Sequence, residues 1–149
     1  MSYRFYLKKL TTNELGYRKG KLVTGQMFFI SKYAAGFFPP LSKEINNDCI
    51  NLRIRMVGTE NLSYLNLVYH NDKHNVPGGT RDEYRIYLNN DIAPHPHVFQ
   101  PEDIITFERT ESDLYDLSIA KPRSENYKNL DSIITKSSLR GNHALCTYI

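Results

Sequence analysis

The chain has 149 residues, of which 40% are hydrophobic and 23% charged, and its formal net charge is only +3. This length and composition indicate one globular domain with a hydrophobic core, and no apolar run is long enough to span a membrane. The cysteines, Cys49 and Cys146, lack the spacing of zinc ligands, and the N-terminus lacks the apolar segment of a signal peptide. We therefore expect a cytoplasmic protein without a bound metal.

Apolar residues that alternate along the chain predict seven short strands. In chain order these strands cover residues 3–10, 26–30, 50–57, 64–70, 81–88, 104–109 and 113–120. A short helix is expected over 31–37, where Ser31 can serve as the N-cap and two prolines end the helix. A second helix is expected over 124–136, and residues 137–149 stay ambiguous. Short strands at close spacing favour a β-sandwich or barrel over β-α-β units.

Charge is unevenly distributed along the chain. Residues 1–40 contain seven lysines and arginines against a single acid, Glu14, whereas residues 102–116 contain six acids against Arg109. This asymmetry predicts a molecule with one side able to face a polyanion. An accidental asymmetry on a solvated surface explains the same counts and stays open.

The most informative segment is Thr-Arg-Asp-Glu-Tyr-Arg at positions 80–85, which follows a pair of glycines. In an extended strand Arg81, Glu83 and Arg85 point to one face at intervals of about 6.6–7 Å, close to two base-pair steps of DNA. Arginine pairs with guanine O6 and N7, and glutamate accepts from cytosine N4. The segment therefore predicts either a reader of G·C pairs or a ladder of ion pairs on an exposed strand.

Two polar loops, residues 16–26 and 71–85, carry residue types that contact DNA. Cations and small polar groups bind phosphates, whereas arginine, carboxylate and amide groups can bond to base edges. The candidate phosphate-binding residues are Arg18, Lys19, Lys21, Lys32, Lys73, His74, Asn75 and Thr80. The candidate base-reading residues are Tyr17, Gln26, Asn71, Arg81, Asp82, Glu83, Tyr84 and Arg85.

Catalytic motifs are missing from the sequence. No lysine has an acid two residues before it, as nucleases of the PD-(D/E)xK type require, and no GxSxG or glycine-rich phosphate loop occurs. We therefore expect no catalytic residue in this chain. One alternative is a small self-contained nuclease or other enzyme with a site around His95, His97, Glu102 and Asp103. Another is a protein-interaction barrel that uses its tyrosines at an interface.

Taken together, residues 3–120 resemble the N-terminal effector domain of EcoRII-type restriction endonucleases. The segments that carry the resemblance are 3–10, 29–39, 67–71, 80–86 and 104–107, and Thr-Arg-x-Glu-x-Arg at 80–85 is the most specific. The resemblance implies a mainly β, seven-stranded B3-like pseudobarrel with one or two short helices, formed by residues 1–123. It implies that residues 124–149 are a C-terminal extension, helical in part, leading to a nuclease domain outside this chain.

In the family that the chain resembles, two arms grip DNA in the major groove. The family's base-reading residues correspond to Arg81, Glu83 and Arg85, whereas two of its basic residues are replaced here by Gly79 and Tyr84. The resemblance implies a prokaryotic Type IIE restriction system whose partner is double-stranded DNA with a short G·C-rich site, CCWGG in the family. It implies no cofactor for this domain, because Mg²⁺ would belong to the separate nuclease domain.

Overall fold

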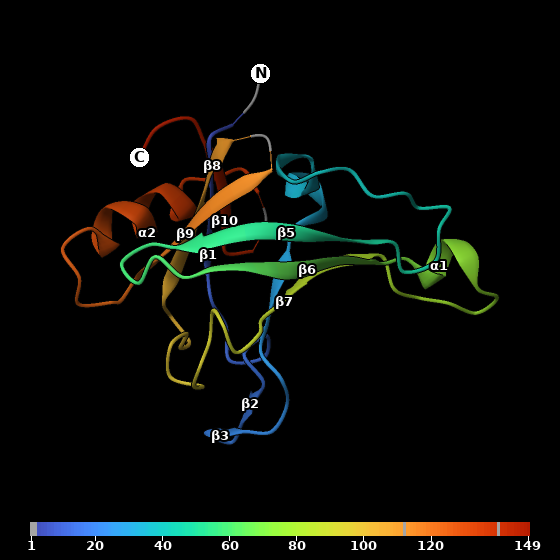
Figure 1. Ribbon diagram of the computed structural model, residues 1–149, viewed down its shortest axis with the longest axis horizontal. Coiled ribbons are helices and arrows are strands. Elements are labelled where there is room, and N and C mark those ends of the chain that lie inside the picture. The colour runs from blue at the N-terminus through green and yellow to red at the C-terminus, as the bar shows by residue number, and fades with distance from the viewer. Residues whose placement is uncertain (1–2, 112, 140) are drawn as a thin grey trace.

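A curled β-sheet forms most of the molecule (Figure 1). The computed structural model describes residues 3–111, 113–139 and 141–149, and in these ranges the sheet has eight strands in the order β10-β1-β8-β9-β5-β6-β7-β4. They are β1 (Phe5–Lys9), β4 (Met27–Ile30), β5 (Cys49–Met56), β6 (Leu62–His70), β7 (Glu83–Tyr87), β8 (Ile104–Glu111), β9 (Leu114–Ala120) and β10 (His143–Cys146). β5 and β9 pair in parallel, and the other neighbouring strands are antiparallel.

The seven strands expected from alternating apolar residues are all present, but the expected count of seven is wrong because β10 adds an eighth. β10 pairs with β1, with Phe5 opposite Cys146 and Lys8 opposite His143. Its four residues are too few for a clear alternation, so its partner strand defines it more than its own sequence. The segment expected to be a loop before β4 also contains a small hairpin of β2 (Tyr17–Arg18) and β3 (Lys21–Leu22).

Both expected helices are present. The 3-10 helix η1 (Lys32–Phe37) begins after Ser31, whose side-chain oxygen accepts a hydrogen bond from the Tyr33 N–H at 3.3 Å. The helix α2 (Tyr127–Thr135) lies within the expected range 124–136. A one-turn helix, α1 (Asp72–Asn75), was not expected. No helix in the described ranges is long and apolar enough to cross a membrane.

The curl of the sheet encloses an aromatic core. Tyr6, Phe38 and Phe107 pack together, with ring centroids between 5.5 and 6.3 Å apart. Side chains of a strand alternate between its faces, so Leu7 points away from this core and packs with Leu130 of α2. The helix thus covers the second face of β1, so this strand is packed on both faces.

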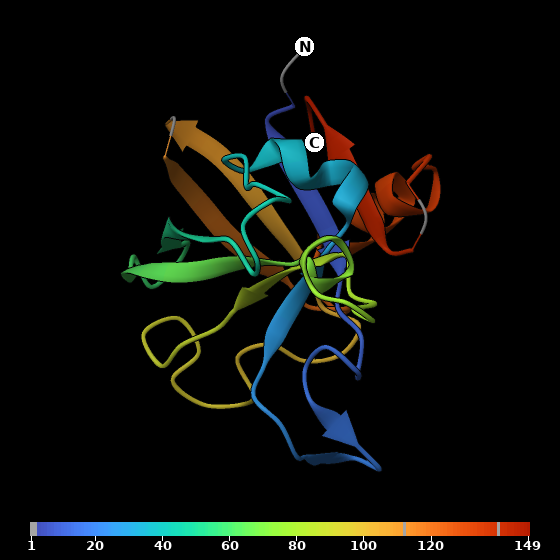
Figure 2. The same ribbon diagram turned by 90° about the vertical axis from the view of Figure 1, so that its right-hand side faces the viewer.

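Two connections project from opposite ends of the β4–β7 pair. We call residues 11–26 the N-arm and residues 71–82 the C-arm. The N-arm leads into β4 at Met27, which lies opposite Tyr87 at the far end of β7, whereas the C-arm leads into β7 at Glu83. Figure 1 shows the hairpin of the N-arm at the bottom and α1 of the C-arm at the right. In Figure 2 the C-arm faces the viewer and the hairpin lies below it, so the two arms stay apart.

Candidate nucleic-acid interface

β7 turns three side chains toward the outer face of the sheet, between the two arms. Glu83, Arg85 and Tyr87 alternate with Tyr84 and Ile86, and Ile86 is fully buried in the core. The expected strand 81–88 is therefore confirmed in its central part, and Glu83 and Arg85 share a face as the alternation predicts.

Two neighbours hold the guanidinium of Arg85. Its Nη2 lies 2.6 Å from Glu83 Oε1, and its Cζ lies 5.1 Å from the centre of the Phe29 ring. Phe29 is directly opposite Arg85 on β4. The aromatic face attracts the cation and gives it a defined orientation. Arg85 and Glu83 thus form a paired, partly exposed polar group at the centre of this face.

Tyr87 and His70 extend this face, although neither was expected as a site residue. Tyr87 Oη lies 2.7 Å from His70 Nε2, and His70 is directly opposite Glu83 on β6. Burial is the main cause that lowers the pKa of His70, which favours the neutral imidazole. We call Glu83, Arg85, Tyr87 and His70 the outer strip. Tyr87 lies two residues beyond Arg85, so continuing the strand alternation is the signal that could have identified it.

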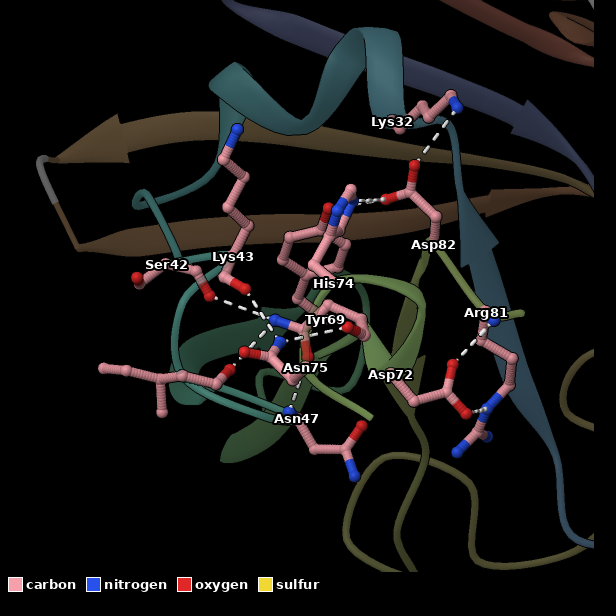
Figure 3. Close-up of polar contacts among 12 residues, drawn as sticks. Lys32, Ser42, Lys43, Asn47, Tyr69, Asp72, His74, Asn75, Arg81 and Asp82 are labelled. Atoms are coloured by element: carbon pink, nitrogen blue, oxygen red, sulfur yellow. Dashed lines mark hydrogen bonds and ion pairs between the residues drawn. The ribbon is translucent and has the colours of Figure 1, made fainter. Parts of the chain in front are cut away.

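Arg81 precedes β7 and contacts α1. Its backbone N–H donates to Asp72 Oδ1 at 2.6 Å, and its side-chain Nε lies 3.5 Å from Asp72 Oδ2 (Figure 3). The backbone hydrogen bond is the main cause that lowers the pKa of the Asp72 carboxyl. The side chain of Arg81 is 42% exposed, so it remains accessible at the surface of the C-arm.

Asp82 and Tyr84 lie on the side of β7 opposite the outer strip. Asp82 accepts from Tyr69 Oη at 2.5 Å and from Lys32 Nζ at 3.4 Å, and His74 Nε2 lies 3.7 Å away (Figure 3). The hydrogen bond from Tyr69 is the main cause that lowers the pKa of Asp82. The Tyr84 ring stacks on Tyr69 with centroids 4.2 Å apart. Both side chains therefore hold the C-arm against the rest of the protein. In this arrangement neither Asp82 nor Tyr84 points toward a position where a base would lie.

Asn71 is fully buried and organises the C-arm from within. Its Oδ1 accepts from the Asn47 N–H at 2.7 Å, and its Nδ2 donates to two carbonyl oxygens of the loop 42–48. Asn75 donates to a carbonyl of the same loop at 2.8 Å (Figure 3). A base contact by Asn71 and a phosphate contact by Asn75 do not fit this geometry, because these amides are engaged inside the protein. Sequence alone does not separate such an internal amide from a surface one.

The surface of the C-arm carries the remaining expected phosphate contacts. Lys73, His74 and Thr80 are exposed. Among the residues that the structure describes, no ion pair involves Lys73. Its charge is therefore available to an external anion.

The tip of the N-arm is a two-residue hairpin turn. Lys19 and Gly20 have φ angles of 52° and 75°, the positive values at both positions that a type I′ turn requires. A non-glycine residue pays about 1–2 kcal/mol for this left-handed conformation. Arg18, Lys19 and Lys21 are all exposed, and the ion pairs of the described residues include none of them. The turn thus presents three cations at the end of the arm.

Tyr17 and Gln26 attach the N-arm to a neighbouring loop. Tyr17 Oη and Gln26 Nε2 donate to the carbonyl oxygen of Pro96 at 3.3 and 3.0 Å. Both donor groups are therefore occupied within the protein. To contact DNA through these donors, each side chain must first break its hydrogen bond to Pro96.

A buried ion pair anchors the base of the N-arm. Glu14 is fully buried and Lys8 is 4% exposed, with Lys8 Nζ 3.2 Å from Glu14 Oε2. Glu14 also accepts the backbone N–H groups of Thr11 and Phe29, both at 2.8 Å. Burial is the main cause that raises the pKa of Glu14 and lowers that of Lys8. One carboxylate therefore joins β1, the N-arm and β4.

A hollow of about 520 Å³ lies between the N-arm and the outer strip. Arg18 and Gln26 line it from the N-arm, and Phe29, Arg85 and Tyr87 line it from the strands. Expected contact residues of the two polar loops therefore share one concave surface.

The residues of the alternative enzyme site are placed differently. Asp103 is buried, pairs with Lys121 and accepts from the Gln100 N–H at 2.9 Å, so it serves a structural role. His95 and His97 lie in an exposed loop with ring centroids 6.2 Å apart. In the described part of the chain, no group of three His, Cys, Asp or Glu side chains could hold a metal ion.

No protein-family model and no curated protein sequence matches the chain. Among solved structures, the N-terminal domain of Helicobacter pylori LlaJI.R1 is similar with a TM-score of 0.65 and 15% identity, over 98% of this chain and 99% of that chain. The B3 domain of the UbaLAI restriction endonuclease, solved with cognate DNA, is similar with a TM-score of 0.57 and 16% identity, over 97% of this chain and 87% of that chain. The chain has a B3-like fold. The expected mainly β, B3-like architecture with few helices is confirmed, with eight strands in place of seven.

Proposed function

We propose that the chain binds a short duplex DNA site in the major groove, with the N-arm and the C-arm on the two sides of the groove. The spacing of the arms carries this proposal. The four residue steps from Glu83 to Tyr87 of β7, at about 3.3 Å each, separate the arms by about 13 Å, and the major groove is about 12 Å wide. The outer strip then faces the floor of the groove.

Base recognition in this proposal comes from Arg81, Glu83 and Arg85. Arginine pairs with guanine through two parallel hydrogen bonds, and glutamate accepts from cytosine N4, so this set favours a G·C-rich site. CCWGG, the site implied by the resemblance, is the first sequence to test. An ion-pair ladder, the alternative interpretation of the segment, describes only Glu83 and Arg85, because Arg81 pairs with α1 instead.

Phosphate contacts come from the exposed cations of both arms, namely Arg18, Lys19, Lys21 and Lys73, together with Lys32, His74 and Thr80. Such contacts fix the orientation of the protein on DNA but carry no sequence information. The two kinds of residue therefore have separable effects on binding.

The similarity of this fold to the B3 domain of the UbaLAI restriction endonuclease supports a role for the chain as the effector or target-recognition domain of a Type II restriction system in a prokaryotic cytoplasm. In that role the chain binds DNA without cleaving it, and a separate Mg²⁺-dependent nuclease domain performs the chemistry.

Selection of bound duplexes from a random library, followed by fluorescence anisotropy at physiological salt, tests the proposal. We expect an enriched, G·C-rich sequence that binds at least about 10³-fold more tightly than a scrambled duplex. Equal binding of selected and scrambled duplexes contradicts specific recognition. Cleavage of plasmid DNA by the chain alone in the presence of Mg²⁺ favours the alternative of a self-contained nuclease.

A further inference from the structure

Asp72 lies where α1 begins and contacts Arg81 with both carboxylate oxygens (Figure 3). We propose that Asp72 is a positioning residue that orients Arg81 for base recognition and so determines specificity at one base pair. This inference rests on the proposed DNA binding.

The geometry leaves the recognition end of Arg81 available. The closest approach of the carboxylate to the guanidinium is at Nε, at 3.5 Å, so Asp72 lies beside the Nε edge of the guanidinium. Guanine recognition uses two parallel N–H donors of the rigid fork. Figure 3 shows the terminal nitrogens of Arg81 extending beyond the carboxylate. Arg85 differs, because its terminal Nη2 is bonded to Glu83.

The backbone fixes Asp72 and Arg81 relative to each other. The Lys73 N–H donates to the Arg81 carbonyl oxygen at 3.1 Å, and the Arg81 N–H donates to Asp72 Oδ1. Gly79 packs directly on this junction, since a Cβ at that position would lie 2.2 Å from the Asp72 carbonyl oxygen. The close approach requires glycine and holds the two segments of the C-arm together.

The start of α1 is anchored to the body of the protein as well. The buried side chain of Asn71 precedes Asp72 and bonds three times to the loop 42–48, and Asn75 bonds to the same loop (Figure 3). Asp72 is therefore a fixed carboxylate, and a fixed partner reduces the rotamer freedom that Arg81 loses on binding.

Charge alone predicts the opposite effect of removing Asp72. Neutralising an acid near DNA strengthens binding to every duplex, because it removes repulsion from phosphates. If Asp72 positions Arg81, its neutralisation weakens selectivity at the base pair that Arg81 reads. The ratio of affinities for two duplexes that differ only at that pair separates the two effects.

The test compares Asp72→Asn with Glu44→Gln in the full chain. Asparagine keeps an oxygen for the Arg81 N–H but loses the ion pair, while Glu44→Gln makes the same charge change in the loop 42–48, where Glu44 bonds to Ser42. Two duplexes serve as probes. The first is the duplex selected from the library. The second differs from it at one base pair, chosen because the Arg81→Ala protein binds the two duplexes equally. We expect Asp72→Asn to lower the affinity ratio about two- to tenfold and Glu44→Gln to leave it unchanged.

A double-mutant cycle completes the test. Asp72→Asn is expected to have no effect on the ratio in the Arg81→Ala background, while thermal melting reports folding of each variant. The inference is overturned if Asp72→Asn has the same affinity ratio as the wild-type protein, while DNA binding stays intact. It is also overturned if Asp72→Asn lowers the ratio equally in the wild-type and the Arg81→Ala backgrounds. Wild-type protein that does not discriminate between duplexes overturns the proposed function instead.

Discussion

The two arginines of the C-arm differ in how they are held. Arg81 is paired along one edge by Asp72, whereas Arg85 is paired at its end by Glu83 and lies over Phe29. Recognition by Arg85 and Glu83 therefore requires them to exchange an internal ion pair for bonds to bases. Only the free-energy difference between the internal ion pair and the bonds to bases contributes to affinity, as when a protein group exchanges a hydrogen bond to water for one inside the protein.

Replacing Arg85 by lysine should separate charge from geometry. Lysine keeps the charge but loses the fork, so we expect the binding free energy on the selected duplex to weaken by about 1–3 kcal/mol while binding to scrambled DNA stays unchanged. Anisotropy titrations with both duplexes measure the effect. An equal loss on both would show that Arg85 contacts phosphates.

Lys19 combines an unfavourable turn conformation with a proposed phosphate contact. Lys19→Asn should stabilise the fold by up to about 1 kcal/mol, since asparagine tolerates positive φ, yet it should weaken binding to all duplexes. The slope of log K against log salt should shrink by about 0.9 for the lost phosphate contact. Urea unfolding and salt titrations check the two effects, with Lys128→Asn on the exposed side of α2 as control. An unchanged slope would exclude Lys19 from the interface.

At the scale of elements, the orientation of the N-arm depends on the buried carboxylate of Glu14. It bonds to backbone groups on both sides of the arm and to Lys8 of β1. Removing one member of such a pair leaves the other charge without compensation, which is more costly than removing both. The pair thus couples the placement of the arm to the integrity of the sheet.

Glu14→Gln should reduce the free energy of unfolding by about 3 kcal/mol, because it leaves Lys8 buried without a counter-charge. Adding Lys8→Met should recover part of this loss. Urea denaturation of the single and double variants measures both, and an additive loss in the double variant would contradict the buried-pair interpretation.

Strands whose apolar residues alternate regularly were predictable from the sequence. The positions of residues and strands that depend on partners distant in the sequence were not. The alternation of Glu83, Arg85 and Tyr87 follows from local strand geometry. The buried position of Asn71 and the eighth strand β10 depend instead on the loop 42–48 and on β1. Polar residue type alone could not distinguish an internal amide from a surface contact, because both satisfy their hydrogen bonds.

At the scale of the whole molecule, β10 is tied to the core through His143. Tyr6 Oη lies 2.6 Å from His143 Nδ1 and accepts the Ser31 N–H at 3.2 Å, so the three groups link β10, β1 and the start of η1. Burial, with a smaller contribution from the charge of Lys8, lowers the pKa of His143 to about 4. The folded protein therefore keeps this imidazole neutral.

This shift predicts a loss of stability in mild acid. Between the unfolded pKa of about 6.5 and the folded value of about 4, the unfolded chain binds a proton that the folded chain does not, so stability falls as pH decreases. Over the upper part of this range, pH 6.5 to 5, His143→Gln should flatten the decrease. Thermal melting at several pH values compares the two proteins, and parallel curves would falsify the assignment.

The length of β7 constrains how this protein can change. Its antiparallel neighbours β4 and β6 fix its register, so deleting a single residue would turn Arg85 toward the core and Ile86 toward solvent. Insertions in the arms carry no such penalty, because loop closure costs rise slowly with length. We therefore expect related proteins to vary in the sequence and length of their arms while the strand between them keeps its number of residues.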